Sequence, residues 1–570
     1  MTVVLAFVLT LAPPQTGGAV QTQTQTQTSG PQRTPARDAA AAEKKGTGVI
    51  RGKITNTEGR PLRRVQLRLS GESIPEGRTA STNGLGKFEI RALPAGRFML
   101  SASRAGYLSM SFGQTRIGEP GRPIELADGE TLEGSDIVLP HTAIISGRVL
   151  DEAGDPLGGA TVLTMQMRYF NGRRRLVPVR GNAISDDTGQ FRLGGLEPGE
   201  YYVQASSRET WETDPPDKQT LGFLPTFYPS APNQGEAQRV RVRSGQEVSV
   251  DVALLPGKVA KVSGTAFTSQ GAPLAGENVN MGIEIRGENF MSSWGGQGTK
   301  VNPDGSFTLN NLAPAEYHLS VRTTGTADRP AEAANVIVSV VGGDVEGVNI
   351  VTSAAGSVLG RVTVDGGPAF PSPLTRLTVR TLPVDRDTAI NSFGFIPDNG
   401  RVKDDGTFEL KQVAGLNRLS VGPLPEGWAI RSIDHNGRDL TTQPLDTQGT
   451  TIDGVAIVLT GKFPVLSGSL RDDKGHSAVT GTVIIFPEDV SLWVEDLRTV
   501  RTARADQTGL FTIKAIRPGE YLAVALTTVQ NNQWNDPEFL ETLRAQATHV
   551  SLRESENKQL ELIVRAAGSY

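Results

Sequence analysis

The chain of 570 residues contains no cysteine and only five histidines. The absence of cysteine excludes disulfides, cysteine-ligated zinc, iron–sulfur clusters and a thiol nucleophile. No excess of positive charge is present either, because 57 Lys and Arg residues stand against 61 Asp and Glu residues. This balance argues against a general nucleic-acid binder and against a polybasic protein of the membrane surface.

Glycine and proline, by contrast, are abundant, with 65 and 35 residues. That content is typical of a chain built from short strands and turns. A hydrophobic fraction of 37% supplies enough apolar surface for several small cores. Length and composition together predict four or five mostly β domains.

The N-terminal segment has one short apolar run, VVLAFVLTLA at residues 3–12. It is too short to span a membrane but has the size of a signal-peptide core, although no Lys or Arg precedes it. We expect residues 1–20 to be a signal-like segment and residues 21–47, rich in Gln and Thr, to be a disordered linker. The expected location is secreted, periplasmic or at the cell surface, without a transmembrane span after export.

A pattern of three short motifs recurs five times along the rest of the chain. A copy opens on a strand that ends in glycine, continues with a Gly-x-Phe strand, and then has a Pro-Gly-x-Tyr strand or a variant of it. The opening glycines are Gly52, Gly147, Gly264, Gly360 and Gly468. They are spaced by about 100 residues, the size of a β-sandwich domain. The phenylalanines of the second motif are Phe88, Phe191, Phe307, Phe408 and Phe511.

The third motif places an aromatic residue after a Pro-Gly or related turn, at Phe98, Tyr201, Tyr317 and Tyr521; the fourth copy lacks it. Glycine before Phe, and glycine after Pro, predict tight turns with a left-handed glycine. Strands such as Val65 to Leu69 alternate apolar and polar residues, which indicates half-buried antiparallel sheet.

These repeats predict five antiparallel β-sandwich domains. Their expected bounds are 48–143, 144–260, 261–357, 358–464, which is divergent, and 465–570, which includes one short helix at about 537–546. Because few residues separate consecutive repeats, we expect an elongated array, a semi-rigid rod in which each domain follows the last.

The combination of motifs resembles the carboxypeptidase regulatory-like domain. The resemblance implies a transthyretin-like seven-stranded sandwich, related to carbohydrate-binding-like folds. In peptidases that carry it, this module is a non-catalytic appendage to a separate zinc domain, so the resemblance implies a fold and no peptidase activity.

The sequence contains no recognisable catalytic or cofactor motif, and we expect no enzyme activity, cofactor or metal. The five histidines lie in different segments and none begins a His-x-x-Glu pair. Asp187-Thr188-Gly189 matches an aspartic-protease triplet, but that chemistry needs two such loops. Asp304 and Asp405 precede repeat glycines as calcium-loop residues do, but the EF-hand spacing with its distal Glu is absent, so the turn interpretation is preferred.

Aromatic residues in the insertions between core strands are the candidate ligand contacts. They are Trp211, Trp294, Trp493 and Trp534, together with Tyr169 and Phe170 beside an Asn171-Gly172 hairpin turn and three arginines. Exposed rings on sandwich loops stack against the apolar faces of sugars. The alternatives are that each tryptophan packs over the end of its own domain and that the hairpin is a solvated edge strand.

Our first functional hypothesis is therefore a non-catalytic binding array for carbohydrate or the cell wall. The alternative is a structural spacer, or a scaffold of the cell envelope that binds proteins by edge-strand addition. An accessory module of a peptidase system, and a glycosidase built from scattered carboxylates, are further interpretations. We expect a polysaccharide or a cell-envelope protein as partner, and no nucleic acid.

Overall fold

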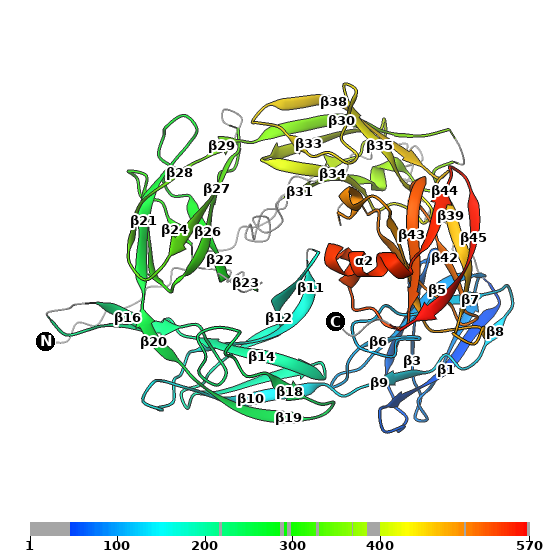
Figure 1. The fold of residues 1–570 in the computed structure, drawn as a ribbon, viewed down its shortest axis with the longest axis horizontal. Coiled ribbons are helices and arrows are strands. Elements are labelled where there is room, and N and C mark those ends of the chain that lie inside the picture. The colour runs from blue at the N-terminus through cyan, green and yellow to red at the C-terminus, as the bar shows by residue number, and fades with distance from the viewer. Residues whose placement is uncertain are drawn as a thin grey trace, which may run out of the picture. The chain divides into compact units, whose positions relative to one another are not determined.

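The computed structural model describes residues 46–170, 172–215, 219–285, 290–292, 298–325, 330–366, 369–384, 400–494 and 498–566. All of them belong to one compact unit, Lys44–Tyr570. Strands dominate this part of the chain, which confirms the predicted all-β fold, and it holds one α-helix, α2 (Pro537–Leu543) (Figure 1). The bounds of the five domains stay a prediction, so the segments are called repeats 1 to 5 below, with the ranges given above.

Repeats 1 and 2 each place their main strands in two sheets. In repeat 1 these are β4-β1-β8, with β9 also on β1, and β3-β2-β5-β6, with β7 on β5. In repeat 2 they are β13-β10-β19 and β17-β14-β11-β12, with β18 on β14, beside a small sheet β15-β16-β20. The strands of repeat 1 are β1 (Gly48–Asn56), β2 (Gln66–Gly71), β3 (Ile74–Ser81), β4 (Lys87–Leu93), β5 (Gly96–Ser103), β6 (Met110–Ser111), β7 (Ile124–Leu126), β8 (Thr131–Leu132) and β9 (Ile137–Leu139). Those of repeat 2 are β10 (Ala143–Leu150), β11 (Thr161–Phe170), β12 (Arg173–Ile184), β13 (Gln190–Leu196), β14 (Gly199–Ser206), β15 (Thr210–Glu212), β16 (Thr220–Leu224), β17 (Thr226–Phe227), β18 (Val240–Val242), β19 (Glu247–Ala253) and β20 (Leu255–Lys258).

Repeats 3 and 4 follow the same plan. Repeat 3 has the sheet β25-β21-β28, and its second sheet, β23-β22-β26-β27-β29, joins that of repeat 2 through one parallel bridge between β12 and β23. Repeat 4 has the sheets β33-β30-β38-β35-β36 and β32-β31-β34-β37. The strands of repeat 3 are β21 (Ala260–Phe267), β22 (Asn278–Ile285), β23 (Phe290–Ser292), β24 (Thr299–Lys300), β25 (Ser306–Leu312), β26 (Ala315–Arg322), β27 (Glu332–Val340), β28 (Val345–Val351) and β29 (Ser353–Ala354). Those of repeat 4 are β30 (Gly356–Val364), β31 (Thr378–Pro383), β32 (Gly400–Arg401), β33 (Thr407–Val413), β34 (Leu416–Gly422), β35 (Ala429–His435), β36 (Arg438–Asp439), β37 (Leu445–Asp446) and β38 (Thr451–Thr460), with the 3₁₀ turn η1 (Leu374–Arg376).

Repeat 5 differs because its strands form one continuous sheet, β41-β40-β43-β45-β39-β42, with β44 on β43. Its elements are β39 (Val465–Arg471), β40 (Thr482–Pro487), η2 (Val490–Leu492), β41 (Arg501–Arg504), β42 (Leu510–Ile513), β43 (Gly519–Leu526), η4 (Gln533–Asn535), α2, η5 (Arg544–Gln546), β44 (Thr548–Leu552) and β45 (Asn557–Arg565). The expected helix is confirmed: the Asp536 side chain accepts a hydrogen bond from the Glu538 N–H, Pro537 opens the helix, and Phe539, Leu540 and Leu543 are buried.

Each opening strand has the same two partners. It pairs antiparallel with the Gly-x-Phe strand and parallel with the closing strand of its own repeat, as β10 does with β13 and β19. The corresponding parallel pairs elsewhere are β1 with β8 and β9, β21 with β28, β30 with β38, and β39 with β45. Most pairings are antiparallel, as predicted, and the parallel pairing of the opening and closing strands is a feature that the sequence pattern did not predict. Period-two alternation reports the buried face of a strand and not the direction of its neighbour.

The close approach of the two parallel strands requires a glycine in the opening strand. A Cβ atom at Gly147 would lie 1.7 Å from the Val250 carbonyl oxygen of the closing strand, and one at Gly468 would lie 1.7 Å from the Leu560 oxygen. At the other opening glycines the distance to the closing segment is 2.4 Å or less. Only a residue without a side chain allows the two backbones to approach so closely.

A further feature shared by all repeats escaped the sequence analysis. The residue just before the Leu, Val or Ile that starts the third motif has a left-handed backbone. These residues are Ala92, Gly195, Asn311, Gln412 and Ala515, with φ between 57° and 77°. In repeats 1 to 4 the strand register shifts here, as in a β-bulge. The prediction of a left-handed glycine after Pro is wrong for Gly199, whose φ is not positive.

Hydrophobic cores follow the repeats, with one main cluster of buried residues in each. The motif aromatics lie inside them: Phe307 is 1% exposed and Tyr201 is 1% exposed. Repeat 5 has a second cluster on the other face of its sheet, where Ile484 and Phe486 meet α2. Its β40 is therefore buried on both faces.

The tyrosine of the third motif also fixes the turn before it. The Tyr201 hydroxyl donates a hydrogen bond to the Glu197 carbonyl at 2.6 Å, and Tyr317 does the same to Ala313 at 2.7 Å. We expect Tyr201→Phe to lower the free energy of unfolding of repeat 2 by about 1 kcal/mol, because a buried carbonyl loses its donor. Urea unfolding, with Tyr202→Phe as the neighbouring control, measures this. Equal effects of the two substitutions would contradict it.

Candidate functional site

Two of the candidate tryptophans pack within their own repeats. Trp211, on β15, lies partly buried against the repeat 2 core, with its ring centroid 5.0 Å from that of Phe223. Trp493 is 5% exposed, meets Phe486 edge to face at 5.5 Å, and donates its Nε1–H to the Pro487 carbonyl at 2.7 Å. The Trp493 ring lacks the exposure that sugar stacking needs, because the second core of repeat 5 covers it. Trp294 lies outside the described residues.

The other candidates, Tyr169, Phe170 and Trp534, come from two repeats to one place. Tyr169 and Phe170 end β11 of repeat 2, and Trp534 lies in η4 of repeat 5. The Gln533 side-chain amide donates a hydrogen bond to the Tyr169 hydroxyl at 3.4 Å. A Cβ atom at Gly172 would lie 2.9 Å from the Asn535 carbonyl oxygen, so the two backbones nearly touch. We call this contact, with its three aromatic residues, the hairpin–η4 junction.

The hairpin–η4 junction offers both apolar and polar groups. Phe170 is 37% exposed, whereas Trp534 is partly buried against the second core of repeat 5. Burial raises the pKa of the Tyr169 hydroxyl, and Asp536 adds to the rise, while Arg174 and the Gln533 hydrogen bond oppose it. The sequence identified the aromatic residues but did not predict that they lie close together. The two segments are more than 360 positions apart in the chain.

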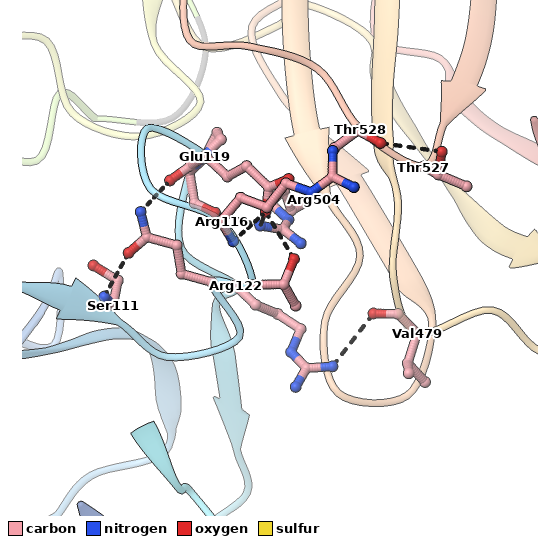
Figure 2. Close-up of polar contacts among 11 residues, drawn as sticks. Ser111, Arg116, Glu119, Arg122, Val479, Arg504, Thr527 and Thr528 are labelled. Carbon is pink, nitrogen blue, oxygen red and sulfur yellow. Dashed lines mark hydrogen bonds and ion pairs between the residues drawn. The ribbon is translucent and has the colours of Figure 1, made fainter. Parts of the chain in front are cut away.

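Repeat 1 also contacts repeat 5, as Figure 2 shows around Arg504. Arg504 Nη1 donates to the Pro120 carbonyl at 2.6 Å and lies 3.6 Å from a Glu119 carboxylate oxygen. The Arg504 and Glu119 side chains are only 7% and 8% exposed. Arg122 Nη1 donates to the Val479 carbonyl at 3.3 Å. These contacts differ from the expected elongated array, in which only consecutive repeats touch.

The loop that presents Glu119 and Pro120 is itself held by short-range bonds. The Gln114 side chain accepts from the Ser111 N–H at 2.8 Å and donates to the Glu119 carbonyl at 2.8 Å. The Glu119 carboxylate accepts from the Arg116 N–H at 3.2 Å (Figure 2). These bonds fix the backbone of the loop, and the Arg116 N–H bond satisfies part of the Glu119 carboxylate.

Repeats 4 and 5 share an ionic network centred on Asp365. The carboxylate pairs with Lys462 at 2.9 Å and with Arg431, and Arg431 pairs with Glu554 of repeat 5 at 3.2 Å. Lys462 and Arg431 lower the pKa of Asp365, against a smaller opposing effect of burial. Because the folded pKa lies below the unfolded one, the contribution of Asp365 is complete above about pH 4 and is lost as the pH falls through the folded pKa.

We therefore expect Asp365→Asn to lower the melting temperature at pH 7, because it removes the charge that Lys462 and Arg431 surround. The difference from the natural sequence should shrink as the pH falls from 4 towards 2. Differential scanning calorimetry across this range measures it. A difference independent of pH would mean that shape, and not charge, is responsible.

Clusters of side chains that could bind a metal ion are absent from the described ranges. No group of three or more His, Asp or Glu side chains there is placed to hold a metal ion. The carboxylates that resembled calcium-loop or protease residues bond within their own turns: Asp304 accepts from Ser306, and Asp405 from Thr407. Next to Asp187, Asp186 accepts from the Thr188 and Gln190 N–H groups.

The helices in the described part of the chain are all too short or too polar to cross a membrane.

A cavity of about 500 Å³ lies where residues of repeats 1, 4 and 5 meet. Its walls include Arg97 and Met99 of repeat 1, Leu424 and Trp428 of repeat 4, and Arg501 of repeat 5. Sequence analysis did not predict it, because no local pattern reports which repeats adjoin.

Comparisons with known proteins find a family for repeats 1 and 2. Residues 49–139 and 144–255 each match the family model of the carboxypeptidase regulatory-like domain. No curated protein matches the chain.

Several solved structures are similar to parts of this chain at low identity. The Bacillus anthracis TIE protein is 14% identical over 54% of this chain, with a TM-score of 0.17, and the chain spans about half (51%) of its length. GBS52, the minor pilin of Streptococcus agalactiae, is 14% identical over 36% of this chain and 95% of its own, with a TM-score of 0.21. A streptococcal ancillary pilin is 12% identical over 54% of this chain and 98% of its own, with a TM-score of 0.18. TM-scores this low carry no information about the function of this chain.

Proposed function

Starting from repeats 1 and 2 as carboxypeptidase regulatory-like domains, we propose that the chain is a non-catalytic scaffold of β-sandwiches that acts outside the cytoplasm. Its task is to hold repeats in fixed contact and to present their outer surfaces to proteins of the cell envelope. The observation that carries this proposal is the Arg504 contact, in which a buried arginine of repeat 5 is bonded to a loop of repeat 1.

Buried and exposed ion pairs differ in how strongly they hold two domains together. An exposed pair contributes little, so it does not hold domains together. Leaving one charge of a buried pair without its partner is strongly destabilising, because that charge stays desolvated. The Arg504–Glu119 pair is of the buried kind, and its arginine also bonds a backbone carbonyl. Packing of Trp211 and Trp493 inside their own repeats is a further point in favour of a structural role.

Spin-label distance measurement tests the scaffold. The absence of native cysteine allows labels at Glu58→Cys in repeat 1 and Lys474→Cys in repeat 5, both exposed turn positions. We expect a narrow distance distribution that broadens when Arg504→Ala is added. Arg68→Ala, an exposed arginine of β2, is the matched control and should leave the distribution narrow. A distribution that is already broad without Arg504→Ala would overturn the proposal.

Carbohydrate binding is the second candidate function, and the hairpin–η4 junction favours it. Aromatic faces beside amide and carboxylate groups are the chemistry that binds sugars, with rings stacking and polar groups bonding hydroxyls. Tyr169, Phe170 and Trp534 supply the rings, and Gln533 and Asp536 supply the polar groups.

Binding of the full chain to a panel of soluble and insoluble polysaccharides, by calorimetry and pull-down, tests this candidate. We expect saturable binding that weakens at least about tenfold with Phe170→Ala, an exposed residue whose loss spares the core. Trp211→Phe, in the same repeat, is the control and should bind normally. Absence of binding, or binding unaffected by Phe170→Ala and Tyr169→Ala, would reject the candidate and leave the scaffold untouched.

A further inference from the structure

Three arginines of repeat 5 line one side of the 500 Å³ cavity without carboxylate partners. They are Arg498, Arg501 and Arg517, and within the described residues none of them forms an ion pair. Other cations of the cavity wall are paired: Lys514 with Glu426 at 2.9 Å, and Arg97 with Glu125 at 3.5 Å. The wall therefore carries an excess of positive charge at one place.

Arg501 is the fixed member of this arginine cluster. Its Nη2 donates to the Ala515 carbonyl at 3.2 Å, which ties it to the turn before β43. Its Nε is buried and has no hydrogen-bond partner. A buried donor without an acceptor is unfavourable, so this nitrogen leaves the Arg501 guanidinium incompletely satisfied.

Electrostatic repulsion within the arginine cluster also favours a bound anion. Burial lowers the pKa of the Arg501 guanidinium, and Arg498 and Arg517 lower it further by repulsion. Burial also lowers the pKa of Arg517, where Tyr521 and Asp439 oppose the effect. Asp439 is already occupied by hydrogen bonds from Thr441 and Thr442. Like charges held together at a partly buried site are stabilised by an anion, and the planar guanidinium suits carboxylate and phosphate.

Apolar side chains line the cavity beside polar ones such as Ser420 and Thr441. Leu424 and Trp428 of repeat 4 line it, and Phe463 follows them at the entry to repeat 5. A volume of about 500 Å³ falls in the range of cavities that hold organic ligands, and it is far larger than an inorganic ion needs. The ligand that fits is thus an anion with an apolar body.

We propose that this cavity binds a small organic anion, whose carboxylate or phosphate group lies against Arg498, Arg501 and Arg517 and whose apolar part faces Leu424, Trp428 and Phe463. All three arginines belong to repeat 5, but repeats 1 and 4 supply other parts of the wall, so the complete cavity rests on the contacts between repeats proposed above.

Calorimetric titration of the full chain tests the proposal with phenyl phosphate, benzoate and inorganic phosphate as probes. We expect saturable binding of phenyl phosphate or benzoate, weakened at least about tenfold by Arg501→Gln and by Arg498→Gln. The first two probes distinguish a phosphate from a carboxylate ligand. Arg68→Gln, on repeat 1, is the control and should bind as the natural chain does. No binding of either organic probe, or inorganic phosphate binding as tightly as they do, would overturn the proposal.

Thermal unfolding separates a ligand site from a structural one. Arg498 is exposed, so Arg498→Gln is expected to fold and, because it relieves repulsion, to melt no lower than the natural chain. Phenyl phosphate should raise the melting temperature of the natural chain and not that of this variant. A lower melting temperature of Arg498→Gln without ligand would assign the cluster a structural role and refute the site.

Discussion

Gly147→Ala is expected to destabilise repeat 2 by at least about 3 kcal/mol, the upper end of the effect of overpacking a core. The added methyl group would lie 1.7 Å from the Val250 carbonyl oxygen, and its obstacle is backbone rather than a side chain that can turn away. The parallel pair of β10 and β19 would have to separate. Urea unfolding, with hydrogen exchange of β10 and β19 followed by mass spectrometry, measures the loss.

Gly194→Ala is the matched control for this substitution. Gly194 lies in β13 of the same repeat, and a Cβ atom there would meet nothing within 4 Å. We expect its effect to stay within about 0.5 kcal/mol, as for ordinary surface substitutions. If both variants were equally stable, the close approach of the opening and closing strands would not be the reason for the repeat glycine.

Trp493→Ala is expected to destabilise repeat 5 by about 3–5 kcal/mol, the range for removing a large aromatic side chain from a core. Its ring fills the second core beside Phe486, and its Nε1–H satisfies the Pro487 carbonyl. Trp493→Phe should be milder, because much of the volume stays and mainly the hydrogen bond is lost. Chemical denaturation followed by exchange protection in β40 and α2 measures both.

This result also decides how a binding experiment is interpreted. If Trp493→Ala left repeat 5 as stable as before while polysaccharide binding disappeared, Trp493 would be a ligand contact. Its assignment to the core of repeat 5 would then be wrong. The expected outcome is the reverse, and a loss of binding in this variant would then report unfolding. Phe170→Ala, on an exposed ring, avoids this ambiguity.

Local chemistry made most of the fold predictable. The turn before Phe88 and its equivalents was read from glycine, and all five glycines have a positive φ. The helix at Pro537 was predicted because capping and apolar spacing are local signals. The shared left-handed residue was missed because Ala92, Gln412 and Ala515 are residue types that do not favour that conformation.

Prediction of the candidate site was limited by what one sequence can report. Composition identified the aromatic residues, but Trp493 lies in an insertion whose polar neighbours suggested exposure, whereas the extra core formed with α2 buries it. The contacts Tyr169–Gln533 and Arg504–Pro120 join positions hundreds of residues apart. Without an alignment of related chains, periodicity and motif spacing do not determine such pairs.

The parallel pairing of opening and closing strands has a mechanical consequence. Tension along the chain would act on β10 at its first residue and on β19 at its last, and parallel strands place these two points at opposite ends of the pair. The seven paired residues, from Ile144 with Glu247 to Leu150 with Ala253, would therefore be loaded together in shear. An antiparallel pair would instead open one bond at a time. Because the opening and closing strands pair in parallel in every repeat, each repeat is expected to resist extension of the chain.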